Sequence, residues 1–215
     1  MSCKTNTTDR ILLSSGGIAA LLFCGIATYE MSTRPGFDIR RHAISMLSLG
    51  DRGWIMAAAF IGSGVLTLLC AAGLSRVVRG SWLAFLIGIY GLGLIAAGIF
   101  PAPASFGFPP GTPDQQLPVM TGSSIIHSMS FMLAFTSLTI ACFVAARHLS
   151  GVPATSSRLA GIAMPVLVVL GMMSIIPTGI AFYVAAIVGW GWLALIVMSL
   201  AEASPESGQP AQSLT

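Results

Sequence analysis

The chain has 215 residues, of which 55% are hydrophobic and only 8% are charged, and its formal net charge at pH 7 is +3. A soluble globular domain carries about a quarter charged residues. This composition excludes an ordinary soluble domain and indicates a chain that lies mostly in lipid. The small positive charge is typical of membrane-protein loops and gives no reason to expect a nucleic-acid partner.

Six apolar runs are long enough to cross about 30 Å of hydrocarbon as helices. Apart from Glu30, at the end of the first run, they contain no Asp, Glu, Lys or Arg. The runs are residues 11–31, 54–75, 82–100, 122–146, 159–176 and 179–201. We therefore predict an all-α integral membrane bundle of six transmembrane helices, which forms a single domain over residues 1–201.

Two features of these runs leave an alternative. Lys4 and Arg10 precede the first run as in a signal peptide, but its apolar core is too long and lacks a clear small-x-small cleavage site, so we expect an uncleaved first span. Only the short Pro-Thr-Gly segment at residues 177–179 separates the last two runs. A re-entrant hairpin is therefore an alternative to two full crossings there.

Basic residues in the short connections indicate the orientation in the membrane. With the N-terminus inside, the cytoplasmic set is larger than the outer set. The cytoplasmic residues are Lys4, Arg10, Arg76, Arg79, Arg147 and Arg158, and the outer residues are Arg34, Arg40, Arg41 and Arg52. We expect both termini to be cytoplasmic, with residues 202–215, rich in Ser, Pro, Gly and Gln, as a disordered tail.

Small residues four positions apart allow membrane helices to approach closely. Such pairs occur in the second and third runs: Ala58 and Gly62, Ala84 and Gly88, and Gly93 and Ala97. We expect these two spans to be central in the bundle.

The connection between the first two runs has a helical pattern over residues 38–49. Its polar residues recur at i, i+3, i+4 and i+7, and the apolar residues lie largely on the other side. The polar residues are Asp38, Arg41, His42 and Ser45. This pattern predicts a short helix in the membrane interface, capped by Asp38 and ended by Gly50.

The loop between the third and fourth runs, residues 101–121, holds six of the twelve prolines together with Phe106 and Phe108. We expect it to fold over the mouth of the bundle. His127 lies about one and a half turns into the fourth run, and an ionisable residue at that depth is a candidate functional residue. The candidate ligand-binding residues of the outer half are Glu30, Asp38, Arg40, Arg41, His42, Ser45, Asp114 and His127.

Four segments carry a resemblance to a known family: RPGFDIRRHAISMLSLGDRGW, GIFPAPASFGFPPGTP, IIHSMSFMLAF and GWGWLALIV. The sequence resembles a family of uncharacterised prokaryotic six-span membrane proteins, domain of unknown function number 998. The resemblance implies a six-helix bundle in the prokaryotic plasma membrane and no established reaction. Relatives often carry acidic residues where this chain has Met46 and the run of residues 102–104.

The favoured function is binding or transport. An outward-facing pocket beneath the proline-rich loop would take a membrane lipid or small amphiphile, with Arg40, Arg41 and His42 meeting an anionic headgroup. The alternative for the arginines is that they only anchor the interfacial helix to lipid phosphates.

Other classes of function stay open. A membrane-embedded enzyme would use His127 as a general base with His42 and either Asp114 or Glu30, whereas a non-catalytic subunit of a membrane complex, or a homo-oligomer, would need no such group. His42 and His127 as haem ligands are a further alternative, which the surface position of His42 disfavours. The chain has no His-x3-His, His-Glu-x2-His or nucleotide-binding loop. We expect no metal site and no cofactor.

Overall fold

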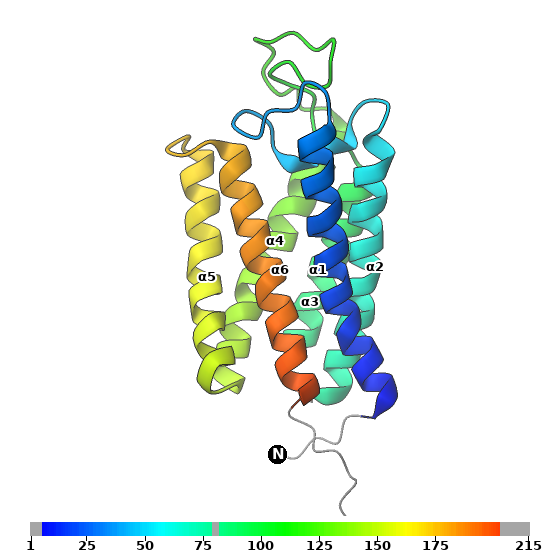
Figure 1. Ribbon diagram of the computed structural model, residues 1–215. Coiled ribbons are helices and arrows are strands. Elements are labelled where there is room, and N and C mark those ends of the chain that lie inside the picture. The colour runs from blue at the N-terminus through cyan, green and yellow to red at the C-terminus, as the bar shows by residue number, and fades with distance from the viewer. Residues whose placement is uncertain (1–5, 79–81, 203–215) are drawn as a thin grey trace, which may run out of the picture.

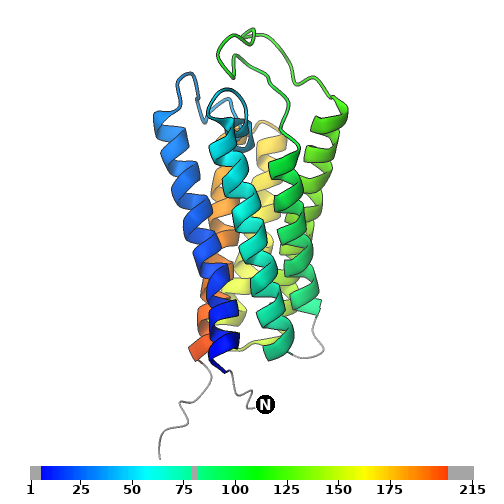
Figure 2. The same ribbon diagram turned by 90° about the vertical axis from the view of Figure 1, so that its right-hand side faces the viewer.

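Six long helices account for most of the structure, a computed structural model that describes residues 6–78 and 82–202 (Figures 1 and 2). They are α1 (Thr7–Thr33), α2 (Gly53–Val77), α3 (Trp82–Ile99), α4 (Gly122–His148), α5 (Gly151–Met172) and α6 (Thr178–Glu202). Each has the length and hydropathy of a membrane span. The predicted all-α, multi-pass, six-span architecture is therefore confirmed. Lys4, Arg79 and residues 203–215 of the predicted tail lie outside the described residues.

The fifth helix differs most from its predicted range. It begins at Gly151, well before residue 159, and ends at Met172. Pro153 lies in the first turn, where its missing N–H is not needed, and Arg158 is exposed on the helix surface. Neither residue interrupts the helix. Both α5 and α6 are long enough to cross a membrane, as two full spans require.

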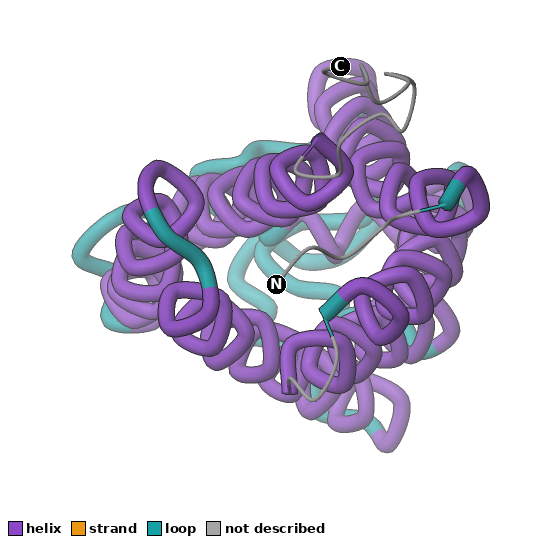
Figure 3. Tube along the Cα trace, turned by 90° about the horizontal axis from the view of Figure 1, so that it is seen from below, coloured by secondary structure: helices purple, strands orange, loops and turns teal. Residues whose placement is uncertain are grey.

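The helices form a ring in chain order. Each helix makes its main contacts with the helices before and after it, and α6 closes the ring against α1. Figure 3 shows this arrangement along the bundle axis. The second and third spans are therefore members of the ring rather than central helices.

The backbones of α2 and α3 come close together at a pair of glycines. A Cβ atom on Gly64 would lie 2.7 Å from the carbonyl oxygen of Gly91, and one on Gly91 would lie 2.9 Å from that of Gly64. Gly93, from one of the predicted pairs, faces α4 instead, because a Cβ atom there would lie 2.8 Å from the Cβ of Ala134. Small residues do form these contacts, but the approach of α2 to α3 at Gly64 and Gly91 uses glycines that the spacing rule did not select.

Different connections between helices lie at the two ends of the bundle. The connections 34–52, 100–121 and 173–177 lie at one end, which we call the loop end (Figures 1 and 2). The beginning of α1 and the end of α6 lie at the opposite end, which we call the termini end. The segments predicted to form an outer rim are thus together at the loop end.

A short helix is present between the first two spans, but it is shorter than predicted. The regular part is a 3-10 helix, η1 (Ile44–Ser48), whereas residues 38–42 form turns. Ala43 has an extended backbone, which ends any continuous helix over residues 38–49. Met46 and Leu47 are buried, so the segment packs its apolar side chains into the bundle. This tertiary contact overrides the helical pattern of the sequence.

Candidate functional site: a cavity at the loop end

A buried ion cluster holds the first loop against the end of α1. Glu30 is fully buried, and its carboxylate binds the guanidinium groups of Arg34 and Arg52. Arg34 is also buried and donates hydrogen bonds to the carbonyl groups of Leu47, Leu49 and Arg52. Each buried charge therefore has a partner of opposite sign and further hydrogen bonds, as burial requires. The cluster fixes the loop that forms one side of the site.

His42 joins this loop to the proline-rich loop, residues 101–121. Its side chain is 2% exposed; Nδ1 accepts the backbone N–H of Asp38, and Nε2 lies 2.9 Å from the carbonyl oxygen of Phe106. A carbonyl only accepts, so Nε2 is the donor in this contact. The imidazole also packs on the ring of Phe108. Both ring nitrogens are occupied, so His42 connects the two loops and leaves no nitrogen for a substrate, metal ion or haem.

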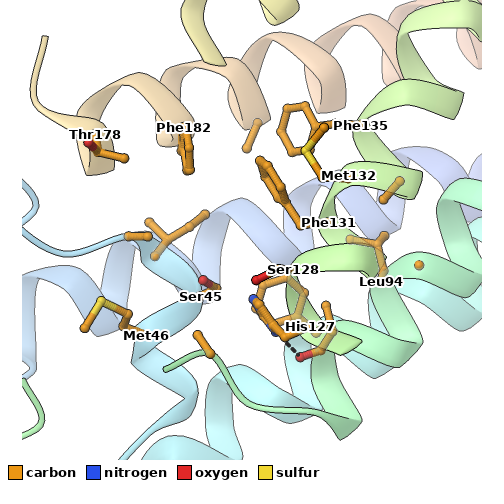
Figure 4. A pocket seen from close by; sticks show the side chains of 18 of the residues that line it. Ser45, Met46, Leu94, His127, Ser128, Phe131, Met132, Phe135, Thr178 and Phe182 are labelled. Carbon is orange, nitrogen blue, oxygen red and sulfur yellow. Dashed lines mark hydrogen bonds between the residues drawn. The ribbon is translucent and has the colours of Figure 1, made fainter. Parts of the chain in front are cut away.

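Beneath the two loops lies a cavity of about 410 Å³, a size within the range of small-molecule sites. Its wall is largely apolar, and Figure 4 shows part of it between α4 and α6. The large apolar lining residues of the helices include Phe23, Phe60, Tyr90, Leu94, Phe131, Met132, Phe135, Phe182 and Trp190. The polar lining residues lie near the loops: Arg41, Ser45, Ser105, His127, Ser128 and Thr178. The cavity thus has one polar end and an apolar shaft.

Trp190 forms the floor of the shaft. Its side chain is 1% exposed, and its ring centroid lies 5.5 Å from that of Phe23 and 5.3 Å from that of Tyr90. Trp190 follows Thr178, the first residue of α6, by about twelve residues, which corresponds to roughly 18 Å of helix. The shaft therefore ends near the middle of the bundle.

His127 lines the cavity from α4 and caps the end of α3. Its Nδ1 lies 2.8 Å from the carbonyl oxygen of Phe100 and 3.3 Å from that of Ala97. The residue after Phe100 is Pro101, which has no N–H to donate to the Ala97 carbonyl. Because both carbonyls only accept, Nδ1 is the donor. Nε2 is then the one ring nitrogen that a ligand in the cavity can use.

Arg41 and Asp114 lie at the mouth of the cavity. The Nη1 of Arg41 is 3.5 Å from Oδ1 of Asp114, and Nη2 donates to the backbone carbonyl of Asp114 at 3.3 Å. The two side chains are 46% and 76% exposed. An exposed pair of this kind contributes about 0–1 kcal/mol, so a ligand anion can replace Asp114 at little cost.

A comparison with protein families identifies the family of this chain. The model of a family described as "Protein of unknown function (DUF998)" matches residues 17–199. The chain belongs to this family. No curated protein and no solved structure shows a significant match to it. The family match confirms the resemblance seen in the sequence.

The structure of this DUF998 chain separates the candidate residues into two groups. Arg41, Ser45 and His127 line the cavity, and Asp114 lies beside Arg41 at its mouth. The others have positions elsewhere at the loop end: Glu30 in the ion cluster, Asp38 in a turn where its Oδ1 accepts the N–H of Arg40, Arg40 exposed, and His42 between the loops. The enzyme-like group of His127, His42 and a carboxylate is not assembled, because no described Asp or Glu lines the cavity.

Sequence reasoning missed two parts of the site in this DUF998 chain. The pairing of Glu30 with Arg34 had a signal, since opposite charges four residues apart meet on one helix face. The aromatic wall had none, because spans that are apolar on all sides carry no periodicity that marks the inner face.

The positions at which the DUF998 chain departs from the resemblance also lie on the cavity wall. Met46, Ala102 and Pro103 are lining residues, and all three are apolar. In residues 6–78 and 82–202 no three His, Cys, Asp or Glu side chains are grouped to hold a metal ion. The wall suits the apolar part of an amphiphile better than acid–base chemistry.

Proposed function

We propose that this DUF998 protein binds one membrane lipid or similar amphiphile in the loop-end cavity, in a binding or transport role. The observation that carries the proposal is the division of the cavity into a polar end and an apolar shaft closed by Trp190. An apolar chain has no polar group of its own to satisfy, so it suits the largely apolar side chains of the shaft. A headgroup then lies at the end where Arg41, Ser45 and His127 are found.

Charge favours an anionic headgroup. Arg41 brings a guanidinium to the mouth, and the lining residues within the described chain include no Asp or Glu. A guanidinium forms its strongest hydrogen bonds with phosphate or carboxylate groups. Ser45 and the Nε2 atom of His127 add hydrogen-bonding groups on the inner side of Arg41. These groups favour a phosphate or carboxylate at the mouth.

Location and orientation are part of the proposal. We place the protein in a prokaryotic plasma membrane with both termini in the cytoplasm, so that the cavity opens near the outer surface. The basic residues of the sequence support this orientation, because six of them fall in segments that it makes cytoplasmic and four in segments that it makes external.

Native mass spectrometry of the full chain purified in mild detergent tests the proposed function. We expect a stoichiometric lipid mass on the wild-type protein. Arg41→Ala removes a charged hydrogen-bond donor, a change worth about 1.5–3 kcal/mol, so the affinity falls roughly tenfold to a hundredfold. Arg40→Ala is the matched control, because Arg40 is exposed and lies outside the cavity.

Two further variants separate the headgroup from the chain. His127→Asn keeps a donor near the position of Nδ1 for the end of α3 and removes Nε2, so binding weakens while the fold is retained. Ala186→Trp places a large ring in the shaft, which Ala186 lines, and excludes the chain. A wild-type protein without bound lipid, or equal loss of lipid from the Arg40→Ala and Arg41→Ala proteins, contradicts the proposal.

A further inference from the structure

We infer that the cavity receives its occupant sideways from the bilayer, between α4 and the α5–α6 pair, and that the occupant is one acyl chain of a phospholipid in the leaflet at the loop end. This inference rests on the proposed function. It adds the source of the ligand, the number of chains and the route.

Two methionines mark an opening in the side of the cavity. Met132 of α4 and Met172 of α5 both line the cavity, yet the two residues are 50% and 63% exposed. The close packing of α4 on α5 lies nearer the termini end, where a Cβ atom on Gly161 would lie 3.1 Å from the ring of Phe143. Near the loop end, flexible thioether side chains thus lie between the cavity and the lipid.

A groove on the outer face of α4 leads to this opening. Its lining residues are Ser128, Met129, Met132, Leu133 and Thr136. Ser128 and Met132 also line the cavity, so the groove and the cavity meet across these two side chains. Met129 and Leu133 are 66% and 54% exposed. An acyl chain lying in this groove is therefore one side chain away from the cavity.

Aromatic rings close the path between α4 and α6. Phe131 stacks on Phe182 with ring centroids 5.2 Å apart and contacts Phe135 at 4.6 Å. Figure 4 shows Phe182 on α6 facing Phe131 and Phe135 on α4. An aromatic pair of this kind contributes about 0.5–1.5 kcal/mol beyond its buried area, so rotation of one ring opens the path at small cost.

The route through the loops is more strongly closed. Phe108 is fully buried, and the bond from Nε2 of His42 to the carbonyl of Phe106 connects the two loops above the cavity. Opening that side breaks this hydrogen bond and leaves groups that cost about 1–3 kcal/mol when buried and unpaired. The side opening moves only methionine and phenylalanine side chains.

The length of the shaft fits a chain from one leaflet. The floor at Trp190 lies roughly 18 Å from the start of α6, and one leaflet is about half of the 30 Å hydrocarbon core. The volume of about 410 Å³ is at the small end of ligand sites. A single chain that keeps its headgroup at the loop end fits both dimensions.

Quenching of Trp190 by lipid tests the route. In the Trp54→Phe/Trp82→Phe protein the exposed tryptophans are gone, and Trp190 and Trp192, which are 1% and 4% exposed, remain. This full-length protein is placed in vesicles, and phosphatidylglycerol brominated on one chain is delivered from cyclodextrin. Bromine quenches on contact, so we expect a slow loss of fluorescence as the chain reaches the floor of the shaft.

Phe182→Ala removes half of the aromatic stack and should speed this quenching roughly twofold to tenfold. If the Phe182→Ala protein does not fold, the Phe182→Leu protein is measured instead. Phe85→Ala is the matched control, because Phe85 is 58% exposed and lies outside the cavity, and it should leave the rate unchanged.

The outcomes separate the two proposals. Quenching that is accelerated by Asp114→Asn at the mouth and not by either Phe182 variant overturns the sideways route and leaves the binding site standing. The absence of any quenching in the Trp54→Phe/Trp82→Phe protein without a further substitution overturns both proposals. Equal acceleration by Phe85→Ala shows a general loosening of the bundle and also overturns the sideways route.

Discussion

At the scale of single residues, the charges of the loop end have a structural use that the sequence did not reveal. Glu30 is the acceptor around which Arg34 and Arg52 are arranged, and Arg34 in turn binds three backbone carbonyls of the following loop. These charged residues hold a loop in place in an otherwise apolar chain. Among the described residues, the ionisable ones that line the site are Arg41 and His127, apart from Tyr90 deep in the shaft.

The ion cluster makes a prediction about stability. Glu30→Gln leaves two guanidinium groups, one of them buried, without their counter-charge, a change that costs about 3–5 kcal/mol. We expect the Tm in detergent to fall by roughly 10 °C, measured by differential scanning fluorimetry. Asp114→Asn removes an exposed pair and should change the Tm by less than about 3 °C. Similar shifts for the two variants contradict the structural role of Glu30.

His127 also explains why two separate sequence features occur together. The Gly-Ile-Phe-Pro segment ends α3 with a proline that leaves the Ala97 carbonyl without a helical partner. The imidazole of His127 supplies the missing donor to Ala97 and Phe100. The sequence identified both features, but only the fold shows that one completes the other.

At the scale of elements, composition predicted the helices but not the structure of the connections between them. Apolar runs predicted all six spans, because a helix is the local structure that satisfies its own backbone in lipid. Residues 38–49 had a helical pattern and formed turns and a short 3-10 helix instead. There the Nε2 atom of His42 has its partner, the carbonyl oxygen of Phe106, in the proline-rich loop, far away in the sequence.

The crossing of α2 and α3 makes a prediction about helix packing. Gly64→Ala places a Cβ atom 2.7 Å from both the Gly91 carbonyl oxygen and the Cγ1 atom of Ile95, so the helices must separate, at a cost of about 1–3 kcal/mol. Gly25→Ala, in α1, meets nothing within 4 Å and should be neutral or slightly stabilising.

The comparison of these two alanine variants uses thermal unfolding in detergent. We expect a lower Tm for Gly64→Ala alone. If both variants unfold like the wild type, the backbones of α2 and α3 are not in the close contact described.

At the scale of the whole molecule, the ring of helices places two separate loops over one cavity. The loop of residues 34–52 and the loop of residues 101–121 are held together by His42 and Arg41. The ring leaves an apolar shaft lined by side chains from all six helices, with Trp190 at its floor. The site therefore belongs to the assembly and to no single helix.

Thiol labelling tests the orientation of the whole molecule. In a background without native cysteines, Arg40→Cys and Gln115→Cys place thiols at the loop end and Ser150→Cys places one at the termini end, all at exposed positions. We expect a membrane-impermeant maleimide added to intact cells to label the first two and not the third. Labelling of Ser150→Cys alone would show that the cavity opens toward the cytoplasm.

The sequence by itself determined the class of protein, the number of spans and the family, because hydropathy and length act locally and need no knowledge of neighbouring helices. It also selected Arg41, Ser45 and His127, which line the cavity. Only the tertiary structure decided that Glu30 and His42 connect loops, and that Phe131, Phe182 and Trp190 form a wall. The physical reason is that in a chain apolar on every face, the direction of a side chain is set by which helices meet in space.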